Sequence, residues 1–258
     1  MTDAVKLAVR IAAAQLSGLS RTRTLVPAGP FTGLLAPSGP DYLNYTVAAR
    51  PGEPVQDPAE VDAGLDALRA AFPEGTLRFE LIDEATPGAV DALEGAGLGV
   101  TLRVPVLTIE PPDLVRPEPA PGVTVELVTT EHDHVLGSVL AHRAFGMGGA
   151  DLPTGPPPEP PDGGMVLARM DGEPVAVASW TPVADGVTEV VGVATVEEYR
   201  RQGFGGLVTA YAVDRVVALA GATLAWLTPG SADADRVYRK VGFRPVATAV
   251  HLAEEPAL

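Results

Sequence analysis

The chain of 258 residues is acidic, with 33 aspartate and glutamate residues against 18 lysine and arginine residues and a formal net charge of −15. A surface of this charge repels nucleic acid and anionic membranes, so we expect neither as a partner. The absence of cysteine excludes disulfide bonds, a thiol nucleophile and thiolate metal sites.

The first 25 residues predict an amphipathic helix. Lys6 and Arg10 interrupt their apolar part, which is not typical of a signal peptide. No apolar run in the sequence approaches the roughly 20 residues that cross a bilayer. We therefore expect a cytoplasmic protein.

Two proline-rich segments divide the rest of the chain. The first, Ile109–Gly122, follows a strand-like run and predicts an interdomain linker, which places the two domains at residues 1–115 and 116–258. The second, Asp151–Gly164, cannot form a regular helix, because proline lacks the amide hydrogen and blocks the preceding turn. A loop of this length within a domain is usually functional or disordered, and we expect it to act as a lid.

The C-terminal half alternates strands and helices, which predicts a mixed α/β domain. A meander of three strands turns at Asp171-Gly172 and again at Asp185-Gly186. A helix ending at Gly221 and a helix capped by Ser231 flank a short buried strand. A further strand follows the second helix.

Part of the N-terminal half resembles part of the C-terminal half. Residues 76–98 align with residues 223–243 when Gly97 is set under Gly242, and both stretches predict a strand, a capped helix and a strand. The aligned pairs are Thr86 with Ser231, Ala89 with Ala234, and Leu93 with Tyr238. This similarity suggests a duplicated unit. The alternative is that any strand–helix–strand segment resembles any other.

The segment Glu197–Gly206 places two arginines before three glycines, between a predicted strand and a predicted helix. Its residues 200–205 fit the pattern R-x-x-G-x-G. Glycine lets the backbone approach a ligand closely, and the amides and dipole at a helix N-terminus attract an anion. Arginine adds charge-assisted hydrogen bonds to phosphate. The loop therefore predicts a phosphate site, with a plain turn and solvated arginines as the alternative.

With its flanks, this loop resembles the cofactor-binding motif of the GNAT superfamily of acyl-CoA N-acyltransferases. The stretch TEVVGVATVEEYRRQGFGGLVTAYAVDRV matches the strand, loop and helix of that motif. Downstream, SADADRVYRKVGF resembles the closing motif of the family, with Ser231 in place of asparagine. The resemblance covers residues 122–252 and implies a tandem α/β protein with two GNAT-like lobes. The N-terminal lobe would be degenerate, and the C-terminal lobe would be catalytic.

The resemblance implies acetyl-CoA, or another acyl-CoA, as co-substrate. Main-chain groups of β-strand residues would pair with the pantetheine arm as an added strand, and a backbone amide near Val193 would stabilise the oxyanion formed on the thioester. Amides of the loop would hold the pyrophosphate. The implied cofactor-binding residues are Val193, Ala194, Thr195, Arg200, Arg201, Gln202, Gly203, Phe204, Gly205, Gly206 and Ser231.

Two side chains are candidates for proton transfer. Glu189 has the spacing of the general-base glutamate in the histone-acetyltransferase branch of the superfamily, and it would take a proton from an ammonium substrate. Tyr238 lies where many family members place a tyrosine near the thioester sulfur, and it would protonate the departing thiolate. The alternatives are a surface glutamate and an aromatic side chain packed on a helix face. Glu126 is a second candidate base.

Three histidines lie close together, at positions 132, 134 and 142. We interpret His132, His134 and His142 as helix-surface residues, because no fourth ligand for a zinc ion is evident. No metal is therefore expected.

The N-terminal half lacks these functional parts. At the place of the arginine–glycine loop it has PGEPVQDPAE, whose acidic residues repel phosphate, and Leu93 takes the place of Tyr238. We expect direct transfer of an acetyl group to a primary amine on a small molecule or a peptide, by a monomer or a homodimer. A non-catalytic acyl-CoA binding module and a purely structural pseudo-enzyme are the alternatives.

Overall fold

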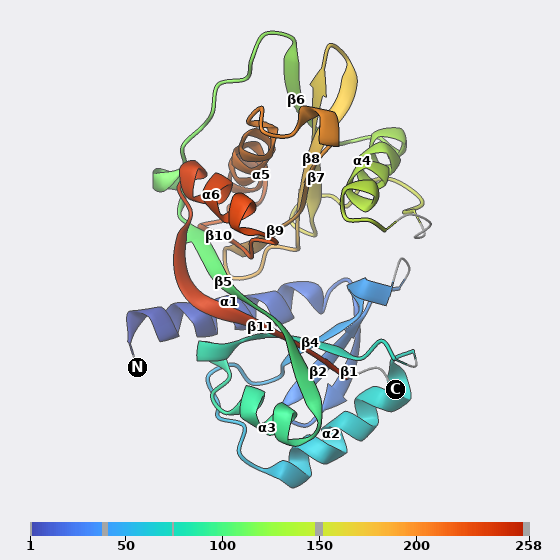
Figure 1. The fold of residues 1–258 in the computed structure, drawn as a ribbon, viewed down its shortest axis with the longest axis vertical. Helices are drawn as coiled ribbons and strands as arrows, with labels where there is room; N and C mark the ends of the chain where they lie inside the picture. Colours follow the sequence, from blue (N-terminus) through green and yellow to red (C-terminus); the bar gives the residue numbers. More distant parts are fainter. Residues whose placement is uncertain (1, 38–40, 74, 148–151, 255–258) are drawn as a thin grey trace. The chain divides into compact units, whose positions relative to one another are not determined.

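The computed structural model describes residues 2–37, 41–73, 75–147 and 152–254. The packing of the chain forms two compact units, both visible in Figure 1. Unit 1 comprises Met1–Val106 and Pro245–Leu258, and unit 2 comprises Leu107–Arg244. Both units combine helices with a mixed sheet, so the α/β class expected from the sequence is confirmed. The expected domains, residues 1–115 and 116–258, stay a prediction.

The sheet of unit 1 has the strand order β1-β2-β3-β4-β11-β5. β3 and β4 are parallel, whereas the β1–β2, β2–β3 and β4–β11 pairs are antiparallel. Phe31 and Phe79 meet edge to face in the apolar core, with ring centroids 5.0 Å apart. The elements are α1 (Asp3–Leu19), β1 (Thr24–Ala28), β2 (Phe31–Leu35), β3 (Tyr45–Ala48), α2 (Pro58–Ala71), β4 (Arg78–Ile82), α3 (Ala89–Gly95), most of β5 (Leu98–Ile109) and most of β11 (Arg244–Glu254). Helix α1 confirms the N-terminal helix predicted from the sequence.

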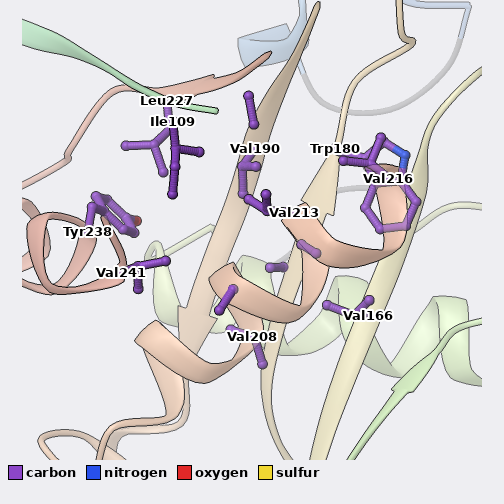
Figure 2. Packing of buried hydrophobic residues seen from close by; sticks show 14 of the residues in the cluster. Ile109, Val166, Trp180, Val190, Val208, Val213, Val216, Leu227, Tyr238 and Val241 are labelled. Carbon is purple, nitrogen blue, oxygen red and sulfur yellow. The ribbon is translucent and has the colours of Figure 1, made fainter. Parts of the chain in front are cut away.

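Unit 2 has the strand order β5-β10-β9-β8-β7-β6, with only the end of β5 belonging to it. β9 and β10 are parallel, and the other pairs are antiparallel. Helix α4 lies on one face of β7–β9 and α5 on the other (Figure 1). The elements are β6 (Val123–Leu127), α4 (Glu131–Ala144), β7 (Gly164–Met170), β8 (Glu173–Trp180), β9 (Val187–Thr195), α5 (Phe204–Ala220), β10 (Leu224–Leu227) and α6 (Ala232–Val241). Figure 2 shows the core beneath α5, where Val208, Val213 and Val216 lie near Val166 and Trp180.

Local chemistry accounts for the turns and ends of unit 2. Asp171-Gly172 and Asp185-Gly186 all have positive φ angles, which a two-residue hairpin turn of the primed type requires. Gly221 ends α5 in the left-handed conformation, and the Ser231 side chain accepts a hydrogen bond from the amide of Ala234. These features confirm the two turns and the two helix ends predicted from the sequence.

The chain builds one order of elements twice. The series α1-β1-β2-β3-α2-β4-α3-β5 is repeated as α4-β7-β8-β9-α5-β10-α6-β11, and the repeat is preceded by β6. The last strands are exchanged between the repeats, because β11 pairs with β4 in unit 1 and the end of β5 pairs with β10 in unit 2. Most of the predicted final strand thus completes unit 1, although the chain reaches it through α6 of unit 2.

Two expectations from the sequence are wrong in detail. Thr86 does not cap α3, because its hydroxyl donates to the carbonyl of Ile82 and the cap position is held by Gly88. The proline-rich segment Ile109–Gly122 is not a linker between the units, since it lies inside unit 2. There the amide of Val115 donates to the carbonyl of Val241, and the guanidinium of Arg116 bonds Asp214 at 2.7 Å.

Candidate functional site

A cavity of about 880 Å³ lies in unit 2 between β9, the start of α5 and α6. The cavity is lined by two arginines and three acidic residues, so its surface carries both positive and negative charge. The lining residues are Ala144, Phe145, Glu189, Val190, Val191, Gly192, Val193, Ala194, Thr195, Glu197, Arg200, Arg201, Gly205, Thr228, Gly230, Ser231, Asp233, Ala234, Val237 and Tyr238.

One edge of β9 opens into this cavity. On that side β10 pairs with β9 only from Val187 to Glu189, after which β9 continues to Thr195 while β10 ends at Leu227. In the described part of the chain no further strand pairing is found along this edge. Backbone groups from residue 190 onward therefore face the cavity as the edge of an incomplete sheet, which an extended ligand can complete.

The other edge of β9 carries a β-bulge. Val177 pairs with Ala194 and Ser179 with Val191, so Ala178 of β8 lies opposite two residues, Gly192 and Val193. Gly192 has φ +63°, a conformation that favours glycine. The extra residue reverses which side chains face which helix: Val190 packs in the core beneath α5, and Ala194 packs in the core beneath α4. The bulge thus redirects the backbone of β9 beside the cavity, which Gly192 and Val193 both line.

The arginine–glycine loop forms the N-terminus of α5. Gly203 precedes the helix with φ +92°, and no side-chain hydrogen bond caps the first turn. The first amides of an α-helix have no partner within the helix, so those of α5 remain for a ligand. Arg201 is also left-handed, with φ +63°, and Arg200 donates from Nε to the carbonyl of Thr195 at 3.3 Å. The loop is therefore tied to the end of β9 and presents positive charge beside the uncapped helix.

Glu189 lies where β9 and β10 separate. Its backbone pairs with Trp226 of β10 on one side and with Thr181 on the other, where the Thr181 amide donates to the Glu189 carbonyl at 2.9 Å. The side chain is half-buried and lines the cavity. A carboxylate held on a strand at the mouth of such a fork has the chemistry of a general base.

Tyr238 lies on α6 and also lines the cavity. Its side chain is 8% exposed, and its ring lies 6.2 Å from that of Phe243. Figure 2 shows it beside Val241 of the same helix, with Ile109 and Leu227 nearby. Burial raises the pKa of Tyr238 to about 12, so the hydroxyl is protonated at neutral pH and can donate a hydrogen bond or a proton.

The structure brings together most of the predicted cofactor residues, but not all of them. Val193, Ala194, Thr195, Arg200, Arg201, Gly205 and Ser231 line the large cavity. Gln202, Gly203 and Phe204 instead line a separate cavity of about 120 Å³ with the segment around Pro117. Gly206 is buried against α6, where a Cβ atom would lie 3.6 Å from Val237.

The remaining candidates lie away from the cavity. Glu126, the second candidate base, is exposed on β6 and does not line it. The three histidines lie on α4, and His134 contacts the carbonyl of Gly155 through Nδ1 at 3.4 Å. Within the described residues no group of three or more histidine, aspartate or glutamate side chains is placed to hold a metal ion. In the same residues no helix has the length and apolar character needed to cross a membrane.

Sequence reasoning missed several residues of the cavity. Phe145, at the end of α4, was overlooked because no motif marks it, although it is a large apolar side chain that is 53% exposed. Gly192 carried the available signal for the bulge, since a glycine within a strand often marks one. Asp233 belongs to the first turn of α6 and could have been found from its closeness to Ser231.

Comparison with known proteins shows which family the chain resembles. The model of the Acetyltransferase (GNAT) family matches residues 127–243. The solved structure of a GCN5-related N-acetyltransferase from Kribbella flavida is 47% identical, covers 97% of this chain and 96% of its own, and has a TM-score of 0.85. A comparison with curated proteins finds no match.

Two more distant structures share the fold. A putative acetyltransferase of the GNAT family from Novosphingobium aromaticivorans is 22% identical over 95% of this chain and 97% of its own, with a TM-score of 0.59. A tandem GNAT protein from the clavulanic acid biosynthesis pathway is 13% identical over 88% of this chain and 79% of its own, with a TM-score of 0.57. The two-unit α/β fold and the likeness to the Kribbella flavida protein lead to one conclusion: the chain belongs to the GCN5-related N-acetyltransferase (GNAT) family, a family of acetyltransferases.

Proposed function

We propose that this protein transfers an acetyl group from acetyl-CoA directly to a primary amine on a small molecule or a peptide. The observation that carries the proposal is the open edge of β9 beside the uncapped N-terminus of α5, both in one cavity of about 880 Å³. An open strand edge fits the amide-bearing pantetheine arm, and an uncapped helix start with two arginines fits a pyrophosphate. We assign the pantetheine arm to the strand edge and the pyrophosphate to the helix start.

Two of the proton transfers have a candidate side chain, and the second proton that the nitrogen loses as the tetrahedral adduct collapses restores the Tyr238 hydroxyl through water. The Glu189 carboxylate takes the proton of the incoming ammonium, directly or through water, which frees the nitrogen lone pair to form the new C–N bond. A backbone amide near Val193 stabilises the negative charge on the carbonyl oxygen. As the C–S bond breaks, the protonated Tyr238 hydroxyl donates to the departing thiolate. The amine nitrogen attacks the thioester directly, so no covalent intermediate with the protein forms; the chain has no cysteine, and the Ser231 hydroxyl in the cavity caps α6.

Acceptor screening combined with two conservative variants tests this proposal. Putrescine, spermidine, lysine, kanamycin and a peptide with a free N-terminus are each incubated with acetyl-CoA, and thiol release is followed. Glu189→Gln is expected to lower kcat by about 10²–10⁴-fold with the fastest acceptor, the range for loss of a general base. Tyr238→Phe is expected to lower kcat by about 10- to 100-fold, since a hydrogen bond to a charged group contributes about 1.5–3 kcal/mol.

Acetyl-CoA should also raise the melting temperature of the wild type and of both variants, because a ligand that binds only the folded state stabilises it. A shift in melting temperature without thiol release would replace the enzyme with a non-catalytic acyl-CoA binding module. Unchanged kcat in both variants would instead overturn the catalytic roles of Glu189 and Tyr238. No shift at all would favour a structural pseudo-enzyme.

A further inference from the structure

The last rung of the β8–β9 ladder, next to Glu189, uses a side chain in place of a backbone carbonyl. The ladder is regular at Trp180 and Val190. At the next rung the Thr181 amide donates to the Glu189 carbonyl at 2.9 Å, as a strand pair requires. The Glu189 amide, however, donates to Thr181 Oγ1 at 3.0 Å, while the Thr181 carbonyl accepts from the Thr188 hydroxyl at 2.7 Å.

The residues after Thr181 explain this exchange. Thr181 precedes Pro182, which restricts its backbone to extended conformations. The pairing resumes at Ala184 and Val187, so Pro182 and Val183 together lie opposite Thr188 alone. This is a second bulge, on the partner strand of β9. It moves the Thr181 carbonyl away from the ladder, and the threonine hydroxyl takes its place.

Glu189 therefore lies between two irregularities in the sheet. One bulge precedes it on the β8 side, the other follows it at Gly192 and Val193, and its pairing with β10 ends at the same residue. Bulges next to active sites redirect side chains. The hydrogen bond from the Thr181 amide to the Glu189 carbonyl joins two backbone groups, whereas the bond from the Glu189 amide ends on the Thr181 side chain. A substitution of Thr181 can therefore remove the second bond.

We propose that Thr181 is a positioning residue for Glu189, whose hydroxyl fixes the backbone amide of the general base where β9 leaves β10. This inference rests on the proposed function, because it concerns the base of that reaction. Thr181 acts on the direction of the carboxylate and not on the open edge of β9, so it affects kcat and leaves the binding of acetyl-CoA unchanged. The expected loss is modest but measurable, since a misplacement of about 1 Å can cost up to about 10²-fold in rate.

The test compares Thr181→Val, which is nearly isosteric, with Thr181→Ser, which keeps the hydroxyl. With the fastest acceptor of the panel, T181V is expected to lower kcat by about 10-fold and to leave the KM for acetyl-CoA within about 2-fold of wild type. T181S should stay within about 3-fold of wild-type kcat. Should T181V fail to fold, Thr181→Ala carries the same expectation. Equal losses in T181V and T181S, or none in T181V, would overturn the positioning role.

A double-mutant cycle separates positioning from a general structural effect. In the Glu189→Gln background the added T181V substitution should lower kcat by less than about 2-fold, because there is no longer a base to position. A full 10-fold loss in that background would show that Thr181 acts independently of Glu189. No thiol release with any acceptor would overturn the proposed function, whereas wild-type rates for E189Q would overturn Glu189 as the base and the positioning inference with it. A large loss for E189Q with none for T181V would overturn the positioning inference alone.

Discussion

The two helices that follow the parallel strands of the two units begin in different ways. In unit 2, α5 follows the left-handed Gly203, and no side-chain hydrogen bond caps it. In unit 1, α2 begins at Pro58, and the Asp57 carboxylate accepts a hydrogen bond from the amide of Ala59 at 3.0 Å. Proline has no amide to offer a ligand, and a carboxylate already occupies the place where an anion would bind. The N-terminus of α2 in unit 1 is therefore capped by the Asp57 side chain, whereas the N-terminus of α5 in unit 2 is available to a ligand.

The same contrast recurs one helix later. Leu93 on α3 and Tyr238 on α6 occupy corresponding places in the repeated order of elements. Leu93 is completely buried in the core of unit 1, whereas Tyr238 packs into the core of unit 2 and also lines the cavity. One architecture thus carries a packing residue in one repeat and a polar functional group in the other. The candidate chemistry therefore depends on a few substituted positions and not on the fold itself.

The largest expected effect is a loss of stability on substitution of Leu93, whereas substitution of Tyr238 should affect the rate of the reaction. Leu93→Ala should lower the free energy of unfolding by about 2–5 kcal/mol, because it leaves a cavity in a fully buried core. The volume-conserving Leu93→Met should cost less than about 1.5 kcal/mol. Tyr238→Phe keeps the ring and should change stability by less than about 1 kcal/mol while lowering kcat. Urea denaturation and thiol release measure the two quantities, and equal destabilisation by L93A and Y238F would contradict the contrast.

A substitution at Gly203 can make the start of α5 resemble that of α2. Gly203→Asp places a carboxylate where Asp57 stands in unit 1, and it should weaken acetyl-CoA binding by about 10- to 100-fold, the range for losing hydrogen bonds to a charged group. Gly203→Asn is the matched control, since asparagine tolerates a positive φ about as well but carries no charge. Isothermal titration calorimetry gives both dissociation constants. If G203N weakens binding as much as G203D, backbone strain rather than charge is responsible.

Features set by local chemistry could be predicted from the sequence. The Asp171-Gly172 turn, the Ser231 cap and the glycine end of α5 each depend on residues next to one another. The arginine–glycine loop at residues 200–205 could be placed at a helix N-terminus for the same reason. The spacing of the two motifs also placed Glu189 and Tyr238, which line one cavity, although α5 and β10 separate α6 from that loop along the chain.

Features set by distant partners could not be predicted in this way. The exchange of β5 and β11 depends on which strand edge each one meets, and neither sequence encodes its partner locally. The bulge at Gly192 depends on its register with β8. Phe145 reaches the cavity from α4 through the packing of that helix on the sheet. Thr86 was misplaced because its hydroxyl has a backbone acceptor one turn away, at Ile82, that competes with capping.

The smallest expected effect concerns a carboxyl group in unit 1. Glu80 on β4 lies opposite His251 on β11, with 3.9 Å between Oε1 and Nδ1, and Arg78 and Arg23 are the neighbouring charges. Burial raises the pKa of Glu80 to about 7, against the opposing effect of the two arginines. The folded state therefore favours the protonated carboxyl. Its contribution to stability is fully present below the ordinary carboxyl pKa near 4.5 and is lost as the pH rises through about 7.

Glu80→Gln removes this titration while keeping the shape of a protonated carboxyl. The variant should melt at nearly the wild-type temperature at pH 5 and about 2–4 °C higher at pH 8, a small change because the Glu80 side chain is 31% exposed and partly solvated. The pKa of His251 is lowered by burial and then by Arg78, so its own effect on stability has the opposite sign and is lost as the pH falls. Glu94→Gln, on the exposed face of α3, is the matched control and should give the same difference in melting temperature at both pH values. If E80Q behaves like E94Q, the Glu80 carboxyl is solvated well enough to ionise freely, and unit 1 differs from unit 2 in its capped helix terminus and its core leucine but not in a buried titrating group.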